Sequence, residues 1–272
     1  MTKTLTLPEA IADLVHDGDT IAMEGFTHLI PFAAAHEIIR QRIRNLTAVR
    51  LTPDLIYDQL IGAGCVSKLV FSWGGNPGVG SLHRFRDAIQ NDWPRPLEIE
   101  EHTHAGLTNR YIAGASGIPF TVMRGYLGTD LFHETKNVAK IKSPFGNEEI
   151  AAVACINPDI TIIHAQQADG NGNVMLWGIV GVQKEAVFSA RKVIVTVEEI
   201  VDVFEPRSNS IVIPSILITA LCVVPGGASP SYALDYYDRD DSQYVAWSDT
   251  SKDRADFAKW LESEIFNESA AK

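Results

Sequence analysis

The stretch that decides the fold is Asp159-Ile160-Thr161-Ile162-Ile163-His164, together with its counterpart Lys192-Val193-Ile194-Val195-Thr196-Val197. Both runs are dense in β-branched residues, a composition typical of strands that are buried on both faces of a parallel sheet. Residues 182–190 lie between them and favour a short helix. The three segments together predict a strand–helix–strand unit with a right-handed crossover.

The same alternation of strand and helix patterns extends over the rest of the chain. Further strands are predicted at 20–23, 46–51, 68–73 and 97–100, and helices at 6–15, 31–44, 54–62, 81–93, 105–117 and 251–266. No low-complexity linker interrupts this pattern. We therefore predict an α/β fold, an open and mostly parallel sheet flanked by helices, in a single domain over residues 1–272. The loop-rich region 124–147 is expected to be a lid or an insertion.

Composition sets the class of protein and narrows its partners. Of the 272 residues, 46% are hydrophobic and 21% are charged, as in an ordinary globular protein. The net charge of −11 argues against a nucleic-acid partner, and no apolar run approaches the roughly 20 residues that span a bilayer. Cys65, Cys155 and Cys222 are isolated, so we expect neither disulfides nor a cysteine metal site. The N-terminus has no signal-peptide apolar core, which predicts a cytoplasmic location.

Small and polar residues follow three of the predicted strands. The first loop is Glu24-Gly25-Phe26-Thr27-His28, where a glycine permits close backbone approach and a threonine hydroxyl precedes the next helix. The second loop, residues 73–81, is rich in glycines whose backbone N–H groups could face an anion. The third is His102-Thr103-His104. Because ligands bind at the carboxyl ends of parallel strands, we expect the site to form from these loops.

The histidines allow a metal site to be considered. Glu100, His102 and His104 alternate, so on a continuing strand they would share one face and could hold zinc. No distant ligand is evident, and we predict no metal site. His28 and His164 are interpreted as hydrogen-bonded structural histidines. The acidic stretch Asp235–Asp241 is interpreted as a solvated loop.

Four motifs, in this order, resemble the A (α) subunits of family I coenzyme A transferases. They are Glu24-Gly25-Phe26-Thr27, Trp73-Gly74-Gly75-Asn76-Pro77-Gly78-Val79, the segment 163–173 and Thr196-Val197-Glu198-Glu199-Ile200-Val201. The resemblance extends from Thr6 to Phe266. It is nearest to members that act on 3-oxoadipate, and more distant from those that act on glutaconate. It implies transfer of CoA from succinyl-CoA to a dicarboxylic or keto acid, with 3-oxoadipate as the expected acceptor.

The resemblance also implies a division of labour between two subunits. The nucleophilic glutamate of these enzymes belongs to a partner B subunit, where it acts by ping-pong covalent catalysis. His104 stands where many members carry a glutamine that donates to the oxyanion, and a histidine can donate there too. The CoA thioester is a substrate, and no metal or tightly bound cofactor is implied. The implied substrate-binding residues, which shape the acyl pocket or hold the small acid, are Gly25, Phe26, Thr27, Gly75, Asn76 and Gly78.

Alternatives remain open for the activity and for the residue that anchors the acid. His104 can titrate near neutral pH and could act on water, which would make the chain a CoA-thioester or ring-opening C–C hydrolase of the same family. A non-catalytic α/β ligand-binding regulator is a further alternative, because fold alone does not fix function. Arg84 and Arg86 are additional candidates for holding the acid.

Overall fold

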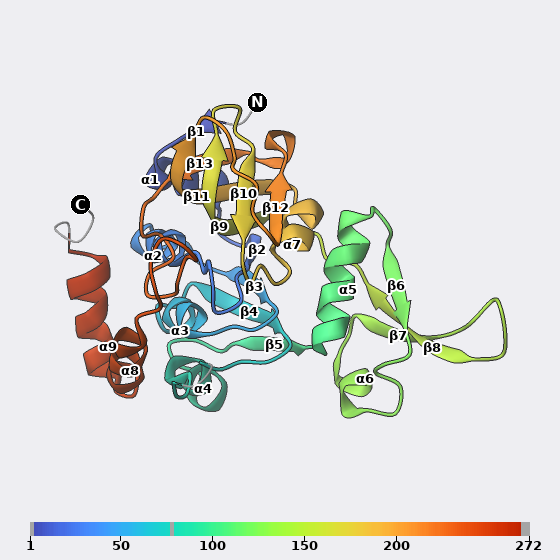
Figure 1. Cartoon of the computed structure of the whole chain (residues 1–272). Coiled ribbons are helices and arrows are strands. Elements are labelled where there is room, and N and C mark those ends of the chain that lie inside the picture. The colour runs from blue at the N-terminus through green and yellow to red at the C-terminus, as the bar shows by residue number, and fades with distance from the viewer. Residues whose placement is uncertain (1–2, 77–78, 268–272) are drawn as a thin grey trace.

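A computed structural model describes residues 3–76 and 79–267 of the chain (Figure 1). Within these residues, ten strands form a large sheet and three form a smaller one. The large sheet has the order β1-β13-β11-β9-β2-β3-β4-β5, and every neighbouring pair in it is parallel. The predicted open, mostly parallel sheet is thus confirmed. Its strands are β1 Lys3–Thr4, β2 Thr20–Met23, β3 Leu46–Arg50, β4 Val66–Phe71, β5 Glu98–Glu101, β9 Ile160–Asp169, β10 Val174–Trp177, β11 Lys192–Val201, β12 Ser210–Ile213 and β13 Ala220–Val223.

Helices cover both faces of this sheet. Along β2, Ile21 and Met23 point into the main hydrophobic core, whereas Ala22 between them packs on the opposite side. The main core is built with α1 (Leu7–Leu14), α2 (Phe32–Arg40), α3 (Leu55–Gly62) and α4 (His83–Asn91). The opposite side is covered by α5 (His104–Ala115) and α7 (Gln183–Ser189). Within the described residues, every helix is too short or too polar to cross a membrane.

The C-terminal region differs from the single predicted helix at 251–266. Two helices are present, α8 (Asp241–Thr250) and α9 (Arg254–Trp260), and α9 continues as a π-helical turn, Leu261–Ile265. The side chain of Asp253 accepts hydrogen bonds from the first backbone N–H groups of α9. Because such a cap marks a helix start, the helix begins three residues later than predicted, and α8 was missed.

The loop-rich region beyond α5 contains a second sheet, which the sequence did not predict. Strands β6 (Phe120–Met123), β7 (Val138–Lys142) and β8 (Glu149–Ala154) are antiparallel in the order β6-β8-β7, with α6 (Asp130–Glu134) between β6 and β7. In Figure 1 this small sheet projects to the side of the large one, next to α5. The region is therefore an ordered antiparallel unit.

Strand β9 changes partners along its length. Residues Ile160 and Ile162 pair with the parallel strand β2, whereas Gln167 and Ala168 pair with the antiparallel strand β10. Strand β2 ends at Met23, so the chain leaves the sheet between the part of β9 that pairs with β2 and the part that pairs with β10. Divergence of neighbouring strands at their carboxyl ends creates the crevice in which open α/β sheets bind ligands.

Candidate functional site

The β2 loop, Glu24–His28, lies where β9 changes partners. His28 Nδ1 is 3.1 Å from the carbonyl oxygen of Ile179, just beyond β10, and the N–H of Leu234 donates to His28 Nε2 over 3.0 Å. These contacts hold the loop against the segment that follows β10. They also confirm that His28 is a buried, hydrogen-bonded structural residue.

The β2 loop has a tight and strained backbone. A Cβ atom on Gly25 would lie 2.7 Å from the carbonyl oxygen of Leu29, so only glycine fits there. Thr27 has a φ of +57°, which is rare for a β-branched residue, and its carbonyl oxygen accepts a hydrogen bond from Ser231 Oγ over 2.9 Å. Phe26 is 39% exposed at the surface of the turn. Strained backbone of this kind concentrates at ligand-binding and catalytic sites.

A buried polar network supports the β2 loop from beneath. Glu24 Oε1 accepts hydrogen bonds from the N–H of Leu51 over 3.0 Å and from the Tyr111 hydroxyl over 2.9 Å. Arg50 is fully buried and donates from Nη2 to the carbonyl oxygen of Gly25 over 2.7 Å. Burial raises the pKa of Glu24 to about 7, although the positive charge of Arg50 opposes the change. The network fixes the turn relative to β3 and α5.

The glycine-rich β4 loop meets the same edge of the sheet. The N–H of Gly75 donates to the carbonyl oxygen of Pro53, in the loop after β3, over 3.0 Å. Asn76 is 4% exposed, and within the described residues neither atom of its amide has a hydrogen-bond partner. Gly78, also predicted to bind substrate, lies outside the described residues. A buried amide without a partner suits contact with a bound molecule, because native proteins rarely leave such groups unsatisfied.

His104 is the first residue of α5. Strand β5 ends at Glu101, and Thr103 caps the helix by accepting a hydrogen bond from the N–H of Gly106 over 2.9 Å. The side chain of His104 is exposed on the first turn. The expectation that Glu100, His102 and His104 would share a strand face is wrong, because the backbone turns into a helix before His104.

Glu100 and His102 instead belong to a buried ion-pair network. Glu100 Oε1 lies 2.5 Å from Arg110 Nη1, 2.9 Å from His102 Nε2 and 2.7 Å from Asn137 Nδ2. Lys68 Nζ is 2.9 Å from Glu100 Oε2. Although burial opposes them, these hydrogen bonds and charges hold the pKa of Glu100 well below its usual value. Burial lowers the pKa of His102, which favours the neutral ring.

This network fastens the small sheet to the large one. Asn137 directly precedes β7, and Tyr126 follows β6. The Tyr126 hydroxyl lies 2.8 Å from His102 Nδ1 and accepts from the N–H of Thr103 over 3.3 Å. A Cβ on Gly106 would collide with the same hydroxyl at 1.8 Å. In the motif that the sequence suggested for chemistry, Glu100 and His102 therefore have a structural role.

A second buried network surrounds His164. This histidine was predicted to be structural, but its partners were not identified from the sequence. His164 Nε2 lies 2.6 Å from Glu198 Oε1, and His164 Nδ1 lies 2.8 Å from Thr196 Oγ1. Glu198 also accepts from the Tyr237 hydroxyl and from the N–H of Gly226. Burial opposes these hydrogen bonds, which nonetheless lower the pKa of Glu198. His164 is hydrogen-bonded on both nitrogens and is structural, as predicted.

The two arginines of α4 differ in their surroundings. Arg84 is buried, with Nη1 3.0 Å from Asp87 Oδ2 and Nη2 donating to the carbonyl oxygen of Lys252 over 3.1 Å. Arg86 is exposed. Arg84 is thus engaged in joining α4 to the C-terminal helices. Among the described residues, no group of His, Cys, Asp or Glu is arranged to hold a metal ion.

A pocket of about 450 Å³ adjoins the β2 loop. Its lining includes Trp177, Gly178, Arg207 and Asp235. A Cβ on Gly178 would lie 3.0 Å from Cε1 of His28, so pocket and loop share a wall. Asp235 accepts hydrogen bonds from Trp177 Nε1 and Arg207 Nη1, and it is therefore not simply solvated as predicted. No strand or glycine signal pointed to Arg207, because it lies in the irregular segment between β11 and β12.

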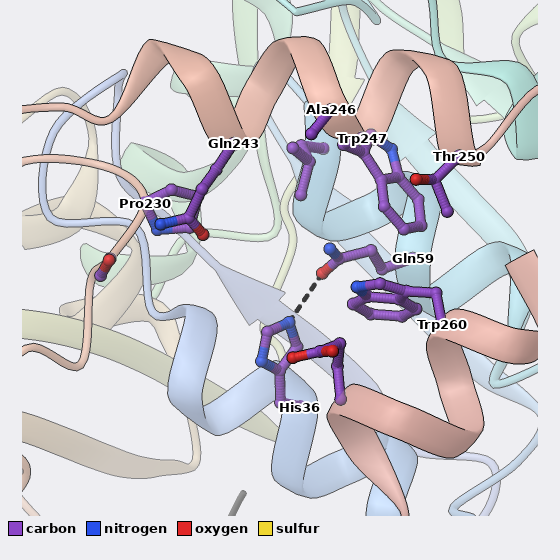
Figure 2. A pocket seen from close by; sticks show the side chains of 11 residues that line it. His36, Gln59, Pro230, Gln243, Ala246, Trp247, Thr250 and Trp260 are labelled. Atoms are coloured by element: carbon purple, nitrogen blue, oxygen red, sulfur yellow. Dashed lines mark hydrogen bonds between the residues drawn. The ribbon is translucent and has the colours of Figure 1, made fainter.

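Another pocket, of about 360 Å³, opens between α2, α3, α8 and α9 (Figure 2). His36 of α2 points toward Gln59 of α3, and its Nε2 lies 2.8 Å from Gln59 Oε1. Trp247 and Trp260 provide aromatic walls. Burial lowers the pKa of His36, which keeps the ring neutral. The lining contains no residue of the β2 or β4 loops, so this pocket is separate from the predicted site.

Comparison with known proteins identifies the family. The coenzyme A transferase family model matches residues 4–223. The chain is 58% identical over 265 residues to the A subunit of 3-oxoadipate CoA-transferase from Pseudomonas knackmussii, covering 97% of this chain and 94% of that protein. It is 34% identical over 289 residues to the A subunit of glutaconate CoA-transferase from Acidaminococcus fermentans, covering 98% and 89%.

The structure agrees with the sequence comparison. The crystal structure of glutaconate coenzyme A-transferase from Acidaminococcus fermentans superimposes with a TM-score of 0.91 at 31% identity, covering 98% of this chain and 89% of that chain. The agreement extends over both sheets and the C-terminal helices, because almost the whole chain is aligned. From its sequence and its fold, this chain belongs to the coenzyme A transferase family.

Proposed function

We propose that the chain is the A subunit of a heteromeric CoA-transferase that moves CoA from succinyl-CoA to a dicarboxylic or keto acid, with 3-oxoadipate as the acceptor. The observation that carries this proposal is the 58% identity, over 97% of the chain, to a protein named as the A subunit of 3-oxoadipate CoA-transferase. The strained glycine turn at the point where β9 changes partners supports a binding site there. We propose that residues 1–272 act as one unit, because the relatives align over nearly all of them.

The nucleophile in this proposal is a glutamate of the partner B subunit. Its carboxylate attacks the acyl-CoA thioester, which gives an acyl-glutamyl anhydride and CoA thiolate. The thiolate then attacks the glutamyl carbonyl, releasing the first acid, and the acceptor carboxylate completes the exchange by the reverse steps. Within this chain, Glu24 and Glu100 are both buried among hydrogen-bond donors. Neither is free to attack a thioester, which favours a nucleophile from the partner.

In this proposal, the residues of this chain bind the acyl group and the acid, and they stabilise the oxyanion. Gly25, Phe26 and Thr27 form the exposed turn against which the acyl group packs. The amide of Asn76, which has no partner among the described residues, contacts the acid together with Gly75 and Gly78. His104, exposed at the N-terminus of α5, donates a hydrogen bond to the oxyanion. These roles follow the family resemblance and the loop positions.

The CoA thioester enters this scheme as a substrate, and no resident cofactor is part of it. Cys65, Cys155 and Cys222 are all free thiols, which is compatible with the reducing interior of a cell. A cytoplasmic location therefore remains part of the proposal.

A CoA-transfer assay tests the proposal directly. The chain is assayed alone and with its co-purifying B-type protein, using succinyl-CoA and 3-oxoadipate, while free thiol is followed in parallel. We expect 3-oxoadipyl-CoA only when both proteins are present, and no thiol release. Thiol release without an acceptor would instead identify a CoA-thioester hydrolase, and binding without turnover would identify a ligand-binding protein.

A further inference from the structure

The pocket beside the β2 loop contains a cation in a fixed orientation. The guanidinium carbon of Arg207 lies 4.4 Å from the centre of the Trp177 ring. Arg207 Nη1 donates to Asp235 Oδ2 over 2.7 Å, and Trp177 Nε1 donates to the same oxygen over 2.9 Å. The stack and the shared acceptor together hold the plane of the guanidinium.

Most of the hydrogen-bonding capacity of Arg207 is unused. Within the described part of the chain, Asp235 is the only side chain that accepts a hydrogen bond from it, and Nη1 is the only nitrogen that donates one. The Nε atom is buried and has no hydrogen-bond partner in the residues that the structure describes. A planar guanidinium with a free edge is suited to a carboxylate, which it can bind through two parallel hydrogen bonds.

The rest of the pocket fits a short carbon chain that ends in an acid. Trp177 and Leu234 provide apolar surface, whereas Ser208 and Asn209 are polar and exposed at the same lining. The N–H of Leu234 also donates to His28 Nε2, which makes the pocket continuous with the β2 loop. A molecule whose reacting end lies at the β2 loop could therefore extend its other end toward Arg207.

We propose that Arg207 binds the unreacted carboxylate of the acid substrate and thereby selects dicarboxylic acids over monocarboxylic acids. This inference rests on the proposed function, because it assumes that an acid reacts at the β2 loop. A dicarboxylate presents a second negative charge at the far end of its chain. The neutral Asn76 amide can accept or donate a hydrogen bond to the acid, but only a cation also attracts that charge.

The test compares two acceptors of equal length in the assembled A–B complex, the dicarboxylate 3-oxoadipate and the monocarboxylate 3-oxohexanoate. The variants are Arg207→Gln, which removes the charge, and Arg207→Lys, which keeps it but loses the fork. Arg124→Gln is the matched control, because Arg124 forms an exposed ion pair with Glu148 on the small sheet. Free CoA, which is not a product of the transfer, is titrated as a dead-end inhibitor, and thermal unfolding of every variant is measured.

We expect Arg207→Gln to raise the KM for the dicarboxylate by about tenfold or more, as for loss of a charge-assisted hydrogen bond, with the KM for the monocarboxylate much less affected. Arg207→Lys should give an intermediate shift and decides the matter if the glutamine variant unfolds. The inhibition constant of CoA should not change. The assignment would be overturned if the KM rose equally for both acids, if the selectivity did not change, or if CoA inhibited the variant more weakly. A wild-type complex that transfers CoA to neither acid would refute the proposed function instead.

Discussion

Replacement of Glu100 by alanine should detach the small sheet from the large one. The substitution removes the acceptor of Arg110, whose side chain is only 6% exposed, and of the fully buried His102. Removal of one partner of a buried ion pair leaves an uncompensated charge and costs about 3–5 kcal/mol. Lys68 is a quarter exposed and can turn to water, so it adds little to this cost. We expect the free energy of unfolding to decrease by an amount in that range.

The loss should be local, which hydrogen exchange can detect. Amide protection should decrease first in β6, β7 and β8 and much less in β9 and β11, because Asn137 and Tyr126 are the links to Glu100 and His102. Glu148→Ala is the matched control, because it breaks the exposed pair with Arg124, and such pairs contribute about 0–1 kcal/mol. A Glu100→Ala variant that is no less stable than Glu148→Ala would refute the reasoning. An equal loss of protection in both sheets would refute it too.

Four further predictions concern the β2 loop and His104. Gly25→Ala should abolish CoA transfer and lower the melting temperature, because its Cβ would lie 2.7 Å from the rigid carbonyl oxygen of Leu29. Thr27→Gly should raise the free energy of unfolding by about 1 kcal/mol by relieving the positive φ, as denaturant titration would show; no gain would mean that the turn is not strained. Glu24→Gln should change how stability depends on pH. Since burial raises the pKa of Glu24 to about 7, the folded chain keeps a proton that the unfolded chain releases above its own pKa near 4.5, and wild-type stability falls as pH rises between these values. Between pH 4 and 8, the free energy of unfolding of the variant, measured in urea, should therefore rise by about 3 kcal/mol relative to that of the wild type. A difference between the two that does not change with pH would contradict the raised pKa of Glu24. His104→Gln should retain most of kcat, whereas His104→Ala should lose about tenfold or more, and equal rates would exclude His104 from oxyanion stabilisation.

The parallel core of the fold was accessible from the sequence, and the antiparallel parts were not. Residues 160–164 and 193–197 are buried on both faces, so their β-branched runs were visible without any partner strand. Strand β6 is short and none of its residues is fully buried, and the small sheet is tied to the large one by Tyr126 and Asn137 through contacts that no local pattern encodes. Tertiary contacts decide the conformation of such segments.

The candidate site was predictable to the extent that it depends on strand ends. The loops after β2 and β4 were identified because glycines follow buried runs. The structure joins the first loop to the end of β3 through Arg50 and the second to the loop after β3 through Pro53. The interpretation of residues 100–104 failed at one backbone turn. Period-two alternation places His102 and His104 on one face only while the strand continues, and it ends at Glu101. Arg207 could not be found, because its role depends on stacking with a distant tryptophan.

The segment that forms the small sheet begins and ends at the same place on the rest of the protein. The N–H of Cys155, directly after β8, donates to the carbonyl oxygen of Pro119, directly before β6, over 3.0 Å. The two ends of this excursion are therefore neighbours, and a short linker could close the gap between them. During evolution such a module can lengthen, shrink or acquire new surface chemistry while the register of the parallel strands stays unchanged. Divergence among relatives should concentrate between these two residues, and the same junction is a natural position for grafting a foreign segment.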